Sequence, residues 1–146
     1  MSLADCLAAH GLADHLCKGL KALGADSVRV TVGKPHKATH SVALDRALKQ
    51  QQPQANRWDY GVALVRPGAH STAWIEVHPA TSGEVQVVLQ KLAWLKQWLA
   101  AGQDACAAAG ASFHWVATDA GVHIDSARRR RLNAAGLKMP RGRLRL

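Results

Sequence analysis

Residues 58–78 of the chain are WDYGVALVRPGAHSTAWIEVH. Both ends of this stretch, 58–65 and 72–77, are rich in apolar, aromatic and β-branched residues, the composition that strands prefer. The segment between them, RPGAH, contains the Pro and Gly that tight turns use. The stretch therefore predicts two strands joined as a β-hairpin.

Upstream of the hairpin, helix and strand patterns alternate. Leucines at helical spacing predict a helix over 3–23, and alternation of apolar and polar residues predicts a half-buried strand over 27–32. A short helix is predicted within 41–50, and its flanks, 33–40 and 50–56, have the composition of loops. This half of the chain is therefore expected to contribute one helix and one strand to the element order, and residues 41–50 could add a short helix.

Downstream, the strongest helical pattern begins at Val85 and has a wide apolar stripe that ends before Gly102. Thr81 and Glu84 fit a capping box at its start, because both side chains can satisfy free backbone groups there. The remaining expected elements are a strand over 113–118, a basic helix over 126–135 and a short edge strand over 142–146. The complete order predicts an α/β fold, with helices packed on a mixed sheet.

The charge of the chain is concentrated at its C-terminal end. Residues 125–146 hold +7 of the formal net charge of +9, from eight basic residues and one acid, and residues 1–124 hold +2. We expect one domain, with 1–124 as its α/β core and 125–146 as its basic helix and tail. The basic residues are Arg128, Arg129, Arg130, Arg131, Lys138, Arg141, Arg143 and Arg145.

Such a charge asymmetry indicates a polyanionic partner. Nucleic acid is the first expectation, with DNA preferred over RNA, and the basic residues are expected to bind its phosphates. An acidic membrane surface, an acidic protein surface, or a solvated tail that only aids solubility would also explain the charge.

Composition and the first residues argue against several classes of protein. No apolar run approaches the roughly 18–20 residues that cross a bilayer, so we expect no membrane partner. The first residues carry Asp5 and Asp14 and lack the pattern of a secretory signal, so we expect a cytoplasmic protein. Cys6, Cys17 and Cys106 are odd in number and widely spaced, and predict neither a disulfide framework nor a cysteine zinc site.

Two acidic residues of the hairpin are candidates for chemistry. Glu76 lies inside the apolar strand 72–77, where an ionised carboxylate is costly unless it is paired, hydrogen-bonded or bound to a metal. Asp59 lies at the start of the preceding strand, and some registers of the hairpin place it beside Glu76. Two carboxylates on adjacent strands offer the hard oxygen ligands that suit Mg²⁺ or Mn²⁺.

The arrangement of Asp59 followed by Glu76-Val77-His78, in the element order above, resembles the PD-(D/E)XK nuclease superfamily over roughly residues 1–120. The resemblance implies a restriction-endonuclease-like mixed central sheet flanked by helices, in the order α-β-β-β-α-β-α. It also implies metal-dependent hydrolysis of phosphodiesters. Asp59 and Glu76 would be metal ligands, the backbone carbonyl of Val77 would be a further ligand, and the cofactor would be Mg²⁺ or Mn²⁺.

The lysine of the superfamily motif is replaced by His78. Histidine is only partly protonated at neutral pH, so His78 could orient or deprotonate the attacking water but would not supply a permanent positive charge. In some members the lysine lies on the following helix, and Lys91 has such a position. Residues 90–94, QKLAW, are also similar to the glutamine-and-aromatic helix motif of RecB-like nucleases. The expected catalytic residues are Asp59, Glu76, His78 and Lys91.

Each of these residues also has a purely structural explanation. Asp59 could form a turn or cap at the start of its strand, and Lys91 could be a solvated helix residue. Glu76 could form an ion pair with Arg66 or Lys91, and His78 could simply end its strand.

Three functions therefore remain open. A PD-(D/E)XK nuclease explains the buried position of Glu76. A catalytically inactive relative that binds nucleic acid accommodates the loss of the motif lysine. A scaffold subunit that docks on an acidic protein explains the basic end alone. The sequence leaves open whether the chain works as a homodimer or beside a partner protein.

Overall fold

A computed structural model describes residues 2–146 of the chain, with the side chains of all but residues 119, 120 and 139. Six strands form a central sheet in the order β1-β3-β4-β5-β6-β7. Neighbouring strands from β1 to β5 are antiparallel, whereas β5 and β6, and β6 and β7, are parallel. The strands are β1 (Cys17–Lys18), β3 (Lys37–Ala43), β4 (Tyr60–Arg66), β5 (Ala69–Thr81), β6 (Ser112–His123) and β7 (Leu137–Arg141); β2 (Val30–Thr31) and β8 (Leu144–Arg145) form a separate parallel pair.

Helices fill the connections between these strands. The α-helices are α1 (Leu3–Ala9), α2 (Leu44–Leu48), α3 (Val85–Ala101), α4 (Gln103–Ala108) and α5 (Ser126–Ala134), and the 3₁₀ segments are η1 (Ala13–His15), η2 (Lys21–Arg29) and η3 (Ser82–Glu84). Within residues 2–146, none of these helices combines the length and the apolar character needed to span a bilayer.

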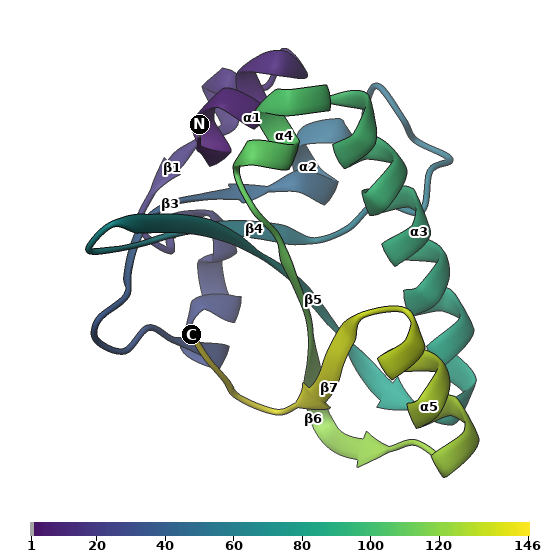
Figure 1. The fold of residues 1–146 in the computed structure, drawn as a ribbon. Coiled ribbons are helices and arrows are strands. Elements are labelled where there is room, and N and C mark those ends of the chain that lie inside the picture. The colour runs from purple at the N-terminus through teal and green to yellow at the C-terminus, as the bar shows by residue number, and fades with distance from the viewer. Residues whose placement is uncertain (1) are drawn as a thin grey trace.

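The two faces of the sheet are covered by different elements. On one face Trp74 and Trp115 are buried with leucines of α1 and α3, and on the other Ile75 and Val116 are buried with Leu144 of β8. Figure 1 shows α1, α3 and α4 on one side of the sheet and η2 on the other. Because successive strand residues point to opposite faces, Trp74 and Ile75 belong to different cores. The chain is therefore α/β, with a mixed sheet flanked by helices, as the sequence predicts.

The predicted hairpin is confirmed. β4 and β5 are joined by a turn at Pro67 and Gly68, and Gly68 has a φ of +76°, in the left-handed region that favours glycine. Within the hairpin Gly61 lies opposite Trp74, and a Cβ at Gly61 would be 2.6 Å from the indole ring. The missing side chain at Gly61 therefore makes room for the indole.

The helix predicted over 3–23 is wrong beyond its first turns. α1 ends at Ala9, and the chain continues through η1 and β1 into η2. Gly11, Gly19 and Gly24 have φ angles of +71°, +52° and +53°, which a continuous right-handed helix does not contain. These glycines divide the leucine pattern into short segments that pack separately.

The strand predicted over 27–32 is also wrong in most of its length. η2 occupies its first half, and Val28 is 72% exposed, so the alternation there does not mark a buried face. In contrast, β3 begins within 33–40, which the sequence predicts as a loop. α2 lies inside the predicted helix 41–50, and the loop over 50–56 is present.

The C-terminal half follows the predicted order with corrections. α3 and α5 coincide with predicted helices, and β6 is longer than the predicted 113–118. The capping box is wrong, because the Thr81 side chain makes no capping hydrogen bond and Glu84 bonds to His78 instead. β7 has no counterpart among the predicted elements. The strand predicted over 142–146 is β8, which pairs with β2 and not with the main sheet.

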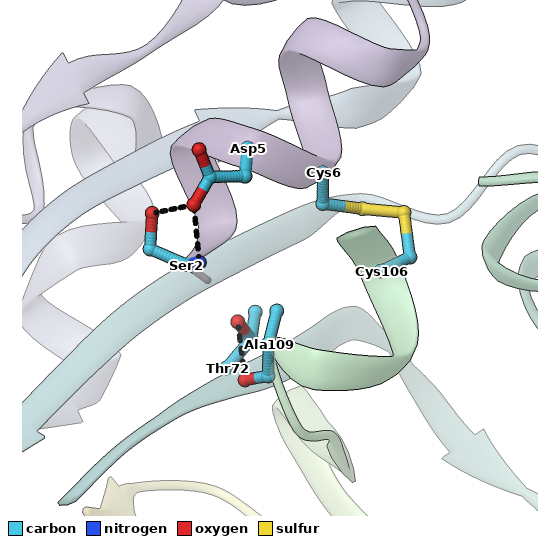
Figure 2. The surroundings of a disulfide bond; sticks show 6 residues. All are labelled: Ser2, Asp5, Cys6, Thr72, Cys106 and Ala109. Carbon is cyan, nitrogen blue, oxygen red and sulfur yellow. Dashed lines mark hydrogen bonds between the residues drawn. A yellow bond between two sulfur atoms is a disulfide. The ribbon is translucent and has the colours of Figure 1, made fainter. Parts of the chain in front are cut away.

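Cys6 of α1 and Cys106 of α4 form a disulfide, which corrects the expectation that the cysteines stay unpaired (Figure 2). Both residues are buried and they are 100 residues apart in the sequence. Close by, the Thr72 hydroxyl donates to the Ala109 carbonyl over 3.4 Å and ties the end of α4 to β5. The spacing of the cysteines could not reveal this pair, since it depends on how α1 packs against α4.

Candidate active site

Asp59 and Glu76 meet at the open end of the β4–β5 hairpin. Tyr60 pairs with Ile75, so the next residues outward, Asp59 and Glu76, lie opposite each other. The Asp59 N–H donates to Glu76 Oε1 over 3.2 Å, and the Val77 N–H donates to Asp59 Oδ2 over 3.0 Å. Each carboxylate therefore uses one oxygen to accept from the backbone of the neighbouring strand.

Lys91 reaches the same pair from α3. Its Nζ contacts Glu76 Oε2 and lies 3.6 Å from Asp59 Oδ1. These are the two oxygens that the backbone N–H groups of Asp59 and Val77 do not engage. Because Val88 and Leu95, each about one turn from Lys91, are fully buried, the lysine stem is held along the packed face of the helix.

The structure decides between the two ion-pair partners considered for Glu76. Lys91 forms the pair, and Arg66 lies exposed at the turn end of β4, the opposite end of that strand from Asp59. Lys91 is also not a solvated helix residue, because its side chain is only 15% exposed. The pairing with Lys91 fits both the structural and the catalytic explanation of Glu76.

His78 lies on the same face and links two acids. Its Nε2 is 2.7 Å from Glu84 Oε2, and its Nδ1 is 3.5 Å from Glu76 Oε2. The hydrogen bond with Glu76, followed by that with Glu84, raises the pKa of His78 above its usual value despite partial burial. The His78 carbonyl accepts from Trp115 Nε1 over 2.9 Å, which attaches this part of β5 to β6.

Glu84 is the site residue that sequence reasoning missed. The sequence pattern assigns its carboxylate to a capping box, whereas η3 turns it back toward β5 and His78. A signal was available in the composition: Glu76 and Glu84 are the only glutamates of the chain. They bind the same imidazole.

The electrostatics of the cluster are dominated by burial and by an excess of negative charge. Glu76 has no exposed surface, and the Asp59 side chain is 23% exposed. Burial and the neighbouring charge of Glu76 raise the pKa of Asp59 to about 7, although Lys91 acts in the opposite direction. One ammonium group therefore does not fully compensate two carboxylates.

Asp59 and Glu76 offer oxygen atoms of the type that hard divalent cations bind, and in this structure Lys91 engages one oxygen of each. Asp59 Oδ1 and Glu76 Oε2 both face the Lys91 ammonium, so a cationic group already lies against one oxygen of each acid. Carboxylate oxygens are the ligands that Mg²⁺ and Mn²⁺ prefer. Val77 takes part through its N–H, and its carbonyl as a metal ligand stays a prediction.

Of the residues that resemble the RecB-like helix motif, Lys91 joins the carboxylates, whereas Gln90 and Trp94 do not. Gln90 is exposed on α3. Trp94 donates from Nε1 to Gln52 Oε1 over 3.1 Å, and its ring stacks on that of Trp98 with 6.3 Å between the ring centroids. Trp94 thereby packs against the loop after α2, so the glutamine and the aromatic residue that define this motif lie outside the site.

The basic residues predicted to bind nucleic acid are divided between two surfaces. Arg128, Arg129, Arg130 and Arg131 are exposed on α5, whose Leu132 packs in the same core as Trp74. The second surface is a groove of about 560 Å³ beside β7 and β8. It is lined by Lys138, Arg141, Arg145 and His114 among others, and Arg143 is exposed nearby.

The α5 surface is connected to the helix that carries Lys91. Arg131 donates to Gln86 on the first turn of α3 over 2.6 Å. Arg128 pairs with Asp125, the N-cap of α5, over 2.6 Å, and Arg129 donates to the Ile124 carbonyl. The Arg131 bond links α5 to α3, whereas the bonds of Arg128 and Arg129 are made within the start of α5.

The groove has a different electrostatic character. No acid is among the described residues that line it. Burial, with the charge of Lys138 as a smaller cause, lowers the pKa of His114 to about 4. His114 is therefore neutral at physiological pH, and the positive charge of the groove comes from its lysine and arginines.

Comparison with known proteins adds no family to this description. None of the protein-family models, curated proteins or solved structures compared with the chain matches it. The likeness to PD-(D/E)XK nucleases is therefore a resemblance of residues and element order, and function has to be argued from the geometry of the site.

Proposed function

We propose that this protein is a metal-dependent nuclease of the PD-(D/E)XK type, with Asp59, Glu76 and Lys91 at its centre. One observation carries the proposal: carboxylates from two neighbouring strands converge on a lysine from the following helix. Glu76 is 17 residues from Asp59 and 15 from Lys91 in the sequence, so only the fold brings them together.

The order of elements around the site supports the same function. β3, β4 and β5 pair antiparallel, with the short α2 between β3 and β4; α3 and the short α4 follow β5, and β6 lies parallel to β5. β3 takes the place that the prediction gives to a strand over 27–32. Strand, strand, strand, helix, strand is the order that the resemblance implies for the core. β1 and β7 extend this core at its two edges.

Asp59 and Glu76 would hold Mg²⁺ or Mn²⁺, with the Val77 carbonyl as a further ligand. Such an ion lowers the pKa of a bound water molecule and stabilises charge on the phosphate. The backbone N–H groups on the other carboxylate oxygens keep both acids oriented. Lys91 provides a positive charge beside them and orients the attacking water.

His78 has a positioning role in this scheme. Glu84 and Glu76 face its two ring nitrogens, so the imidazole fixes the orientation of Glu76 Oε2. The permanent positive charge that the motif lysine supplies in the superfamily comes from Lys91 instead. The replacement at position 78 is therefore compatible with catalysis.

DNA is the expected substrate, and α5 is its expected docking surface. The exposed arginines of α5 can neutralise phosphates, and α5 is attached through Gln86 to the helix of Lys91. The groove beside β7 and β8 is a second basic surface, lined by Trp115 and Leu137 of the first core and by Leu144 of the second.

The test is cleavage of linear and supercoiled duplex DNA, and of RNA, in Mg²⁺, Mn²⁺ or EDTA. We expect cleavage of DNA with either ion and none in EDTA. Glu76→Gln keeps the size of the side chain and should slow cleavage at least about 100-fold, because an ionic ligand is lost. Asp104→Asn, which changes an exposed acid of α4, is the matched control and should cleave like the wild type. Cleavage that survives Glu76→Gln, in protein with native circular dichroism, contradicts the proposal.

One observation favours a second candidate, an inactive relative that binds nucleic acid. Glu76 is fully buried and already paired with Lys91, which is also how a structural ion pair is built. In this case DNA binds in EDTA with a steep dependence on salt, and no cleavage follows with any divalent ion. The same assay therefore distinguishes the two candidates.

A further inference from the structure

A second cluster of metal-ligating side chains lies far from the carboxylates in the sequence. Cys6 and His10 belong to α1 and its C-cap, and Cys106 belongs to α4. One ligand atom of each, the two Sγ atoms and a ring nitrogen, lies within 4.8 Å of the others. The disulfide of Figure 2 therefore has an imidazole beside it.

The histidine of this cluster has an unused nitrogen. His10 Nε2 is buried and has no hydrogen-bond partner among the described residues. The ring is held in place by stacking on Trp98, with 3.8 Å between the ring centroids and 14° between the planes. A buried nitrogen without a partner is costly, so its position next to two sulfur atoms calls for an explanation.

The chain also keeps space open at this point. A Cβ on Gly102 would collide with Cys106 Sγ and would lie 2.9 Å from His10 Nε2. Gly102 has a φ of −77°, so its backbone does not require glycine. Its missing side chain instead leaves room beside the sulfur and the nitrogen.

We propose that Cys6, Cys106 and His10 form a zinc site when the disulfide is reduced. A dithiol reductant supplies two electrons and two protons, becomes a disulfide itself and leaves two thiols on the protein. Zn²⁺ then binds both sulfur atoms as thiolates and His10 through Nε2, and two protons are released to solvent. A small-molecule disulfide accepts two electrons from the thiolates and two protons from solvent, becomes two thiols, restores the Cys6–Cys106 disulfide and releases Zn²⁺.

The chemistry of the three ligands suits this ion. Thiolate and imidazole ligands favour zinc over the hard cations that a carboxylate pair binds. Zinc bonds of about 2.3 Å to sulfur and 2.0–2.1 Å to nitrogen place the ligand atoms within about 4 Å of one another. The nitrogen already lies within 4.8 Å of both sulfur atoms, whereas the bonded sulfur atoms have to separate. Three protein ligands leave the fourth position for water.

Two grooves give the ion a path to the cluster. His10 lines one of about 310 Å³, and Cys106 lines another of about 420 Å³. The two sulfur atoms must move apart when the disulfide opens, and they are carried by helices of only 7 and 6 residues. Both states link α1 to α4, by a covalent bond when oxidised and by the metal when reduced.

The experiment compares oxidised and dithiol-reduced full-length protein, with Zn²⁺ measured by equilibrium dialysis and Co²⁺ as a spectroscopic probe. We expect about one equivalent of zinc on the reduced protein, a sulfur-to-cobalt charge-transfer band, and neither on the oxidised protein. His10→Gln should weaken zinc binding at least about tenfold, because losses of this size follow even from removing groups that only support a ligand. His15→Gln, which changes an exposed histidine nearby, is the matched control.

The charge-transfer band separates this site from any metal at Asp59 and Glu76, since only sulfur ligands produce it. Cys106→Ser should abolish the band, whereas Cys17→Ser, at the free cysteine, should leave it intact. Should reduction unfold the protein, restoration of native circular dichroism by Zn²⁺ in the wild type but not in His10→Gln supports the site. Reduced wild-type protein that shows no band, or that binds zinc no better than Cys106→Ser, overturns the proposal.

Discussion

The backbone N–H of Asp59 donates to the buried carboxylate of Glu76 over 3.2 Å. This bond continues the β4–β5 pairing one residue beyond Tyr60 and Ile75, with the Glu76 carboxylate as the acceptor in place of a backbone carbonyl. It brings two acids to one face of the sheet, where their repulsion has to be compensated. The cation that the structure provides for this is Lys91, and the first prediction concerns it.

Lys91→Met should destabilise the protein by about 3 kcal/mol, because it removes the cation from a buried pair and leaves the charge of Glu76 uncompensated. Mg²⁺ or Mn²⁺ should restore part of this loss if the carboxylates bind a divalent ion. The measurement is urea unfolding at pH 7.5 with EDTA and with each ion.

Lys49→Met, at an exposed lysine after α2, is the control and should change the free energy of unfolding by less than about 0.5 kcal/mol. A Lys91→Met variant that is as stable as the wild type would show that the ammonium is not needed to hold the acids together. If the unfolding free energy of Lys91→Met is the same in Mg²⁺, Mn²⁺ and EDTA, the result counts against a metal site.

Replacing the four arginines of α5 by Gln should flatten the salt dependence of DNA binding. Each phosphate contact contributes about 0.9 to the slope of log K against log salt, so up to about 3.6 should be lost. Fluorescence anisotropy with a short duplex in EDTA, over a series of KCl concentrations, measures this slope.

The matched variant also removes four cations, because it changes Lys138, Arg141 and Arg145 of the groove and the neighbouring Arg143 to Gln. Because α5 is attached to the helix of Lys91 through Gln86, we expect the groove variant to lose less of the slope than the α5 variant. A larger loss of slope in the groove variant than in the α5 variant would place the DNA-binding surface in the groove.

The hairpin and its two acids could be predicted from the sequence because the signals are local. Apolar strands on either side of Pro67 and Gly68 determine the pairing, and an acid inside such a strand needs a partner. Lys91 is a candidate through the resemblance and as one of two possible ion-pair partners of Glu76, and only the packing of α3 on the sheet decides for it over Arg66.

Other features depend on contacts between distant segments. The pairing of Cys6 with Cys106 follows from the packing of α1 on α4, and Glu84 reaches His78 through the turn of η3. The leucines of 3–23 have helical spacing, but glycines with positive φ interrupt the helix, and spacing alone does not reveal which conformation a glycine adopts.

Gly61→Ala should destabilise the protein by about 1–3 kcal/mol. Its Cβ would lie 2.6 Å from the Trp74 ring, so the indole or the strand has to shift. Gly83→Ala is the control, because a Cβ at Gly83 would have no atom within 4 Å and the φ of Gly83 is not positive. Urea unfolding measures both variants, and equal stabilities would show that Trp74 has free space on the β4 side.

His114 should make stability depend on pH. Burial holds its pKa at about 4 in the folded state, against about 6.5 for an exposed histidine. Between these values the unfolded chain binds the proton more readily, so stability falls as pH drops through this window. Above pH 6.5 His114 is neutral in both states and does not lower the free energy of unfolding. By pH 4.5 its protonation in the unfolded chain should have lowered this free energy by about 2–3 kcal/mol.

The measurement is the difference in unfolding free energy between wild type and His114→Gln, at pH 7.5 and at pH 4.5. Taking the difference removes the opposite trend from Asp59, whose raised pKa lets the folded state bind the proton more readily between pH 4 and 7. Lys138→Met should reduce the pH dependence only partly, because Lys138 is the smaller cause of the shift and burial the larger. A wild-type advantage over His114→Gln that is the same at both pH values would mean that His114 is solvated in the folded protein and that the groove is open to water at this position.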